Sequence, residues 1–326
     1  DFFWMIDLSD NLELTDEMIN NTFFECLENS SLITFLLYNT SVTLQKKQKI
    51  AKKLLKNLIK LLKGPEKPLL KYLDWRFQAF NDDILNELLE TDILKDSQLE
   101  RIYLTGNNIT DVTADLLLEV INSNKTNLTF VDLALTAVTP RKNEEVINAC
   151  VNNIVRLLKT ENVLIDLCLG CRYFPSYITD NHINAICTVL QGNVMLRHLL
   201  LDGNYLLTDK SANAILEILP NTNICSVRLS NIPAISDDKQ KEIVRICLIN
   251  LFKLLVSEGA MIPKKLYWSD CHIDDTIINE FIGKLKVHEN LNLKIFLNGN
   301  PDITDKMRIE LYRSVLPTNP GIEFFL

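Results

Sequence analysis

The sequence repeats itself at a fixed distance of 96 residues. Three apolar segments, at residues 32–37, 128–133 and 224–229, can be aligned without gaps, and their last residues are 96 positions apart in both steps. A fixed period of this kind indicates a stack of similar repeats rather than one globule around a cleft. It favours a protein that displays a surface over one that catalyses a reaction.

Each period divides into three shorter repeats. The clearest has the pattern L-x-x-I-x-L-x-x-N over residues 99–107. With its second leucine taken as the anchor, ten repeats can be counted, and Ile322 and Phe324 offer the strand of an unfinished eleventh. The ten anchors are Leu8, Leu37, Trp75, Leu104, Leu133, Leu169, Leu201, Leu229, Trp268 and Leu297.

Every repeat combines a strand signal with a helix signal. Alternating apolar residues before the anchor predict a short strand with one buried face. A Thr or Ser followed by Asp and a helical apolar period predicts a helix start. Such pairs are Thr110-Asp111, Thr208-Asp209, Ser236-Asp237 and Thr304-Asp305. We therefore expect one α/β solenoid domain over residues 1–326, with parallel strands on its concave face and helices on its convex face.

The repeat resembles the leucine-rich repeat family, specifically its ribonuclease-inhibitor-like branch. The resemblance rests on the apolar positions and on an Asn or Cys at the ladder position after the strand. These ladder residues are Asn11, Asn107, Asn204, Cys271 and Asn300. Five repeats depart from the ladder, with Thr40, Gln78, Thr136, Arg172 and Ile232 at that position. Together with the period, the resemblance implies a horseshoe of about ten repeats in three superrepeats of about 96 residues.

Composition is ordinary for a soluble, folded chain. Hydrophobic residues make up 47% and charged residues 23% of the sequence, and no apolar run reaches the length of a membrane span. The net charge of −8 argues against general nucleic-acid binding. Both ends of the sequence fall on strands without polar capping repeats, which is typical of a fragment of a longer protein.

Cysteines and motifs give no sign of catalysis. Eight cysteines in 326 residues are too sparse for a secreted disulfide framework, so we expect a reducing, intracellular environment. Cys168 and Cys171 form a lone CxxC without a second pair, which does not predict a metal site. No phosphate-binding glycine loop, GxSxG or HExxH motif is present. We expect a monomer that is not an enzyme and binds neither metal nor cofactor.

Strand geometry selects candidates for partner binding. Side chains alternate along a strand, so residues three before, one before and one after an anchor should face the concave surface. In the third to fifth repeats these candidates are Tyr72, Asp74, Arg76, Arg101, Tyr103, Phe130 and Asp132. A second set near the C-terminal end comprises Lys265, Tyr267 and Phe296. Aromatic residues and arginine dominate interface hot spots. The alternative is that these aromatics only stack on their neighbours along the sheet.

The predicted helix over residues 44–63 has an unusual charge. It contains eight lysines and no acidic residue, whereas the corresponding helices of the other two periods carry mixed charge. Candidates for contact with an anionic surface are Lys49, Lys52, Lys53, Lys56 and Lys60. A basic amphipathic helix is typical of membrane-surface binding. The alternative is that its apolar half covers the sheet and its lysines are merely solvated.

The expected function is that of a protein–protein interaction module with a partner on its concave face. The Lys-, Asn- and Ile-rich composition and the irregular ladder resemble the leucine-rich repeat effectors that intracellular bacteria of the Legionella type deliver into host cells. That resemblance implies a secreted effector that binds a host protein. Other possibilities are a ribonuclease-inhibitor-like or GTPase-activating-like regulator of an enzyme, the sensor domain of a larger switch protein, and a membrane-surface adaptor that uses residues 44–63.

Overall fold

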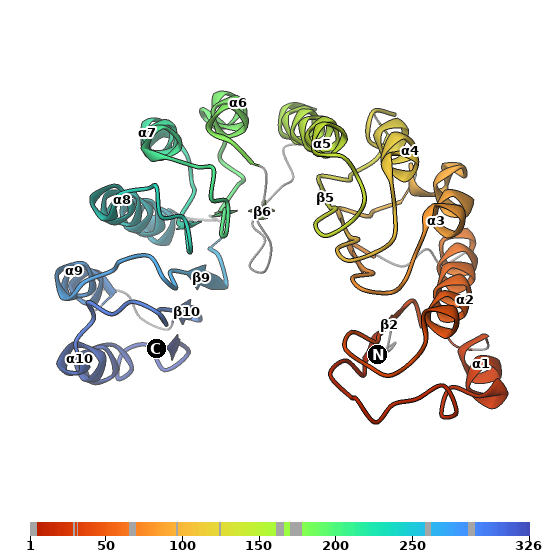
Figure 1. Ribbon diagram of the computed structural model, residues 1–326. Coiled ribbons are helices and arrows are strands. Elements are labelled where there is room, and N and C mark those ends of the chain that lie inside the picture. Colours follow the sequence, from red (N-terminus) through yellow and green to blue (C-terminus); the bar gives the residue numbers. More distant parts are fainter. Residues whose placement is uncertain are drawn as a thin grey trace. The chain divides into compact units, whose positions relative to one another are not determined.

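The computed structural model shows a repeated strand–helix architecture (Figure 1). It describes residues 5–28, 30, 32–64, 70–95, 97–123, 125–160, 166–169, 178–257, 262–285 and 291–326. The chain divides into two compact units, Asp1–Ile154 and Val155–Leu326. Within each unit the helices lie on one side of the short strands (Figure 1).

The elements of the N-terminal unit follow the predicted order of strand and helix. They are β1 (Met5–Asp7), α1 (Asn21–Glu28), β2 (Thr34–Leu36), α2 (Leu44–Lys63), β3 (Tyr72–Asp74), α3 (Asp82–Leu89), the 3-10 helix η1 (Asp92–Leu94), β4 (Arg101–Tyr103), α4 (Asp111–Ile121), β5 (Phe130–Asp132) and α5 (Pro140–Thr160), which runs past the end of the unit.

The C-terminal unit continues the same order. Its elements are β6 (Asp166–Cys168), α6 (Asp180–Leu190), β7 (His198–Leu200), α7 (Asp209–Ile218), the 3-10 helix η2 (Leu219–Asn221), β8 (Ser226–Arg228), α8 (Asp237–Val256), β9 (Lys265–Tyr267), α9 (Asp275–Leu285), β10 (Lys294–Phe296), α10 (Asp305–Val315) and β11 (Glu323–Phe325). Each of the first ten strands ends one residue before its predicted anchor, so the predicted repeat positions are confirmed.

The strands pair in parallel, but the hydrogen-bonded ladder is interrupted. The described strands form the sheets β1–β2, β3–β4–β5, β6–β7–β8 and β9–β10–β11. At two interruptions a buried tryptophan follows the next strand and reaches back across the break. Trp75 Nε1 donates to the Ile33 carbonyl at 2.7 Å, and Trp268 Nε1 donates to the Cys225 carbonyl at 3.3 Å. These side chains therefore connect strands that do not pair through their backbones.

The interruptions follow strands whose next helix is long. Helices α2 and α8 have 20 residues and α5 has 21, whereas the others have 8 to 11. Asn57, Asn153 and Asn250 are buried within the three long helices. Each donates to two backbone carbonyls between the end of the preceding helix and the strand that follows it, at 2.8 to 3.2 Å. These features recur about every 96 residues; the horseshoe and its three superrepeats stay predictions.

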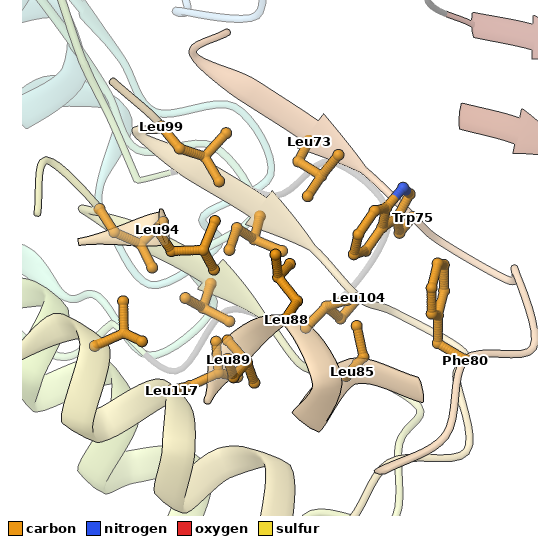
Figure 2. Close-up of a cluster of buried hydrophobic side chains, with 14 of the residues drawn as sticks. Leu73, Trp75, Phe80, Leu85, Leu88, Leu89, Leu94, Leu99, Leu104 and Leu117 are labelled. Carbon is orange, nitrogen blue, oxygen red and sulfur yellow. The ribbon is translucent and has the colours of Figure 1, made fainter. Parts of the chain in front are cut away.

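The core lies between the strands and the helices. In the N-terminal unit Trp75 stacks on Phe80 with ring centroids 4.3 Å apart, and leucines of β3, α3 and the segments beside β4 surround them (Figure 2). In the C-terminal unit Trp268 occupies the corresponding position and meets the edge of Phe281 at 5.2 Å. Burial of these apolar side chains supplies the main stabilisation, because no single repeat can cover its own apolar face.

The predicted polar ladder is clearest at Asn107. Its amide nitrogen donates to the carbonyls of Trp75 and Leu104, both at 2.7 Å. Its amide oxygen accepts the backbone N–H groups of Gln78 at 3.2 Å and Phe80 at 3.0 Å. One side chain thus satisfies four buried backbone groups where the chain leaves the strand.

Asn300 repeats this pattern in the C-terminal unit, where it accepts the N–H groups of Cys271 and Ile273. Asn11 does not fit, because its side chain is exposed. The prediction that Asn11 forms part of the buried ladder is therefore wrong. Its repeat lies at the start of the described chain, where β1 pairs only with β2.

Candidate partner-binding surface

Strand residues that point away from the helices form what we call the strand face. In the N-terminal unit, Tyr72 lies opposite Arg101, and Asp74 lies opposite Tyr103. Together with Arg76 after β3, these residues form the β3–β4 patch. Tyr72 is 51% exposed, and the other four are partly exposed. The structure therefore brings together five of the seven residues predicted for this surface.

Side-chain contacts order the β3–β4 patch. The Arg101 guanidinium carbon lies 5.1 Å from the centre of the Tyr72 ring, and that of Arg76 lies 5.7 Å from the centre of the Tyr103 ring. Arg76 also forms a two-pronged ion pair with Asp74, with Nη2–Oδ2 at 2.6 Å and Nε–Oδ1 at 2.9 Å. Cation–π contacts and paired hydrogen bonds of this kind restrict the arginine rotamers.

Phe130 and Asp132 are buried, which corrects the expectation that they are exposed with the rest of the patch. They are 9% and 7% exposed, respectively. The Phe130 ring packs against Tyr103 with centroids 5.5 Å apart. The Asp132 carboxylate accepts the Thr105 hydroxyl at 2.6 Å and the Ala134 N–H at 3.0 Å. Contacts with neighbours along the sheet therefore account for these two side chains.

The second predicted set lies together on the strand face of the C-terminal unit. Lys265 is exposed, and Tyr267 and Phe296 are half-buried; we call these three residues the β9–β10 patch. The two rings stack with centroids 5.4 Å apart and planes 12° apart, and Phe325 continues the stack at 4.5 Å. Stacking along the sheet thus covers part of the aromatic area.

A pocket of about 360 Å³ opens beside the β9–β10 patch. Its wall includes His198, which is buried, meets the edge of the Tyr267 ring at 5.4 Å, and places Nε2 3.7 Å from Asp166 Oδ1. Burial lowers the pKa of His198, Asp166 opposes this effect, and Arg197 adds to it. The remaining wall residues are Arg197, Ile262, Pro263, Lys264 and Lys265. Alternation along the sixth and seventh strands places Asp166 and His198 on the strand face, three residues before their anchors. The wall formed by Ile262 and Pro263 lies before β9 and has no such signal in the sequence.

The lysine-rich segment forms α2 with the predicted bounds. Lys49, Lys52, Lys56 and Lys60 are exposed. Lys53 differs, because it is half-buried and its Nζ lies 2.5 Å from Glu28 Oε2. The prediction of a free anionic-surface lysine is therefore corrected for Lys53, whose charge is paired within the unit.

The described part of the chain contains no group of three or more His, Cys, Asp and Glu side chains arranged to hold a metal ion. Cys168 lies at the end of β6, whereas the other cysteine of the CxxC motif, Cys171, lies outside the described residues. None of the described helices is long and apolar enough to cross a membrane.

Comparisons with known proteins assign no family to the chain. No protein-family model matches the chain, and neither does any curated protein. Among solved structures, the chain is similar to one in the crystal structure of the yeast Rad7 and Elc1 complex, with 15% identity, a TM-score of 0.48, and coverage of 95% of this chain and 78% of that chain. A likeness at this level carries no argument about fold or function. The chain itself is built as an α/β repeat with parallel strands.

Proposed function

We propose that the chain is a protein-interaction module and that the β3–β4 patch binds a partner protein. The observation that carries this proposal is the ordering of its arginine and tyrosine side chains, with Arg101 over Tyr72 and Arg76 over Tyr103. Side chains that are already held in place lose little conformational freedom when a partner binds. Tyrosine and arginine also combine large contact area with hydrogen-bonding groups.

The chain acts in this proposal by binding and not by catalysis. Its strands form the concave face of a horseshoe with three superrepeats, and the β9–β10 patch makes a secondary contact. The partner is a host protein, and the chain is a secreted bacterial effector. Support for this last step is the resemblance of its composition and irregular ladder to the leucine-rich repeat effectors of intracellular bacteria.

The test compares capture of proteins from a eukaryotic lysate by three forms of the chain. They are the wild type, the double variant Arg101→Ala/Tyr103→Ala, and the control Tyr205→Ala/Arg313→Ala. The control also removes one tyrosine and one arginine, both exposed and both in the C-terminal unit rather than on the strands of the β3–β4 patch. We expect a partner that the wild type and the control retain and the patch variant loses. Equal retention by the patch variant would contradict the proposal.

A further inference from the structure

A continuous row of lysines follows the outer side of α2. It consists of Lys49, Lys52, Lys56, Lys60 and Lys63, all of which are exposed; we call it the lysine row. Steps of three and four residues keep side chains on one side of a helix. With a rise of about 1.5 Å per residue, the row is about 21 Å long.

Most of the charge of this row is not used within the fold; the exception is Lys49, whose Nζ lies 4.2 Å from the centre of the Phe24 ring of α1. Like charges three or four residues apart destabilise a helix, and among the described residues no ion pair joins the row to an acidic side chain. Lysines at the sides of α2 have polar partners within the unit. Lys53 pairs with Glu28, and Lys46 donates to the Ile19 carbonyl at 2.5 Å. The equally long α8 carries acidic residues in its first turn. Packing therefore requires a long helix but not a basic one.

The apolar side of α2 is already occupied. Ile50, Leu54, Leu55, Leu58 and Leu62 are between 0% and 6% exposed and belong to the core. An interfacial helix normally inserts its apolar side between lipids. Helix α2 cannot do so while the unit is folded, so any contact through its outer side is electrostatic.

The neighbouring helices leave part of the row uncovered. Helix α2 lies between α1 and α3 (Figure 1) and has 20 residues, whereas α1 and α3 have 8 each. Asn57 donates to the carbonyl of Leu27 near the end of α1, so Lys60 and Lys63 lie further along α2 than that end. The end of the row therefore extends past the end of α1.

We propose that the lysine row binds the anionic headgroups of a membrane surface, with α2 parallel to the bilayer. A row of charges along the exposed side of a helix can follow a plane of mobile lipid charges. The remaining chain is acidic, since the net charge is −8, so an anionic plane would attract this side and repel others. Each lysine near such a surface contributes about a fivefold gain in affinity.

The experiment measures co-sedimentation of the full chain with phosphatidylcholine vesicles, with and without phosphatidylserine, at low and high salt. The test variant neutralises the middle of the row with Lys52→Gln, Lys56→Gln and Lys60→Gln. The control variant makes the same charge change at exposed lysines elsewhere, with Lys125→Gln, Lys210→Gln and Lys306→Gln. Circular dichroism and the thermal midpoint verify that both variants fold.

We expect wild type and control to bind only vesicles that contain phosphatidylserine, and to release them at high salt because exposed charges are screened. The row variant should bind about a hundredfold more weakly at low salt. Absence of wild-type binding at low salt would overturn the proposal, and so would equal loss in both variants. The proposal would also be overturned if wild type did not bind the vesicles but bound heparin or polyglutamate, and the row variant lost that binding. These results do not depend on the β3–β4 patch, so they separate this proposal from the proposed function.

Discussion

The carboxylate of Asp180, at the first residue of α6, holds Thr208, the residue that caps the next helix. Asp180 Oδ1 accepts the Thr208 backbone N–H at 2.9 Å, and Oδ2 accepts its hydroxyl at 2.7 Å. The same arrangement joins four further helix starts to the following cap, through Asp82, Asp111, Asp209 and Asp275. Asp16, which lies before α1, holds Thr43 at the start of α2 in the same way. An aspartate that begins one helix therefore also connects its repeat to the next.

Removal of this connection should destabilise the C-terminal unit. Asp180→Ala leaves the N–H and hydroxyl of Thr208 and the hydroxyl of Ser211 without their acceptor. We expect the free energy of unfolding to fall by about 1–3 kcal/mol, measured by urea denaturation. Asp238→Ala, which also removes an acidic residue from a first turn, should have an effect of about 0.5 kcal/mol or less. Equal effects of the two substitutions would contradict the assigned role of Asp180.

Stability should decrease in acid because these aspartates are hydrogen-bonded as anions. Burial raises the pKa of Asp180, but hydrogen bonds from Ser211 and Thr208 lower it by more, so the net shift is downward. A carboxylate whose pKa is lower in the folded than in the unfolded chain stabilises the fold. This contribution is fully present above the pKa of the unfolded chain, which is about 3.9. This contribution is lost as the pH falls through the folded pKa.

Urea midpoints measured from neutral pH to below about pH 4 should therefore fall with pH. The variant Asp180→Asn has no carboxylate at this position and should show a shallower decrease than wild type. An identical pH dependence of the two proteins would show that Asp180 is not the titrating group.

The two asparagines at ladder positions 11 and 107 should respond differently to substitution. Asn107→Ala deprives four backbone groups of their partner, and we expect a loss of about 2–4 kcal/mol. Asn11→Ala removes an exposed side chain and should change stability by about 0.5 kcal/mol or less. Thermal or urea unfolding measures both, and similar losses would contradict the buried ladder at Asn107.

Thiol labelling should separate the cysteines by burial. Cys26 is exposed, whereas Cys150, Cys187, Cys225, Cys247 and Cys271 are buried. Burial raises the pKa of Cys150 to about 12, so little of the reactive thiolate is present. With maleimide at neutral pH, mass spectrometry should find Cys26 labelled rapidly and Cys150 only in denaturant. Rapid labelling of Cys150 in the folded chain would contradict the described packing.

The repeat could be predicted because its signals are local. Each anchor lies next to its strand, and the pair Thr110-Asp111 marks a helix that does start at Asp111. Asn107 was identifiable for the same reason, since its position three residues after an anchor places it where the strand ends. These features depend on residues only a few positions apart.

Contacts between repeats could not be predicted in the same way. The bond from Thr208 to Asp180 spans 28 residues, and no local pattern assigns a capping residue to the aspartate of the previous helix. The burial of Phe130 depends on how the neighbouring Tyr103 packs, which alternation along one strand cannot show. The pairing of Lys53 with Glu28 depends on how α1 lies against α2.

The β3–β4 patch is tested most directly by the dissociation constant of a purified partner for the wild type and for Arg101→Ala/Tyr103→Ala. Loss of two hot-spot side chains should raise the constant at least about thirtyfold, which corresponds to about 2 kcal/mol. Both residues are only partly buried, so the thermal midpoint should change little. A dissociation constant within about twofold of wild type, with the fold intact, would contradict partner binding at this patch.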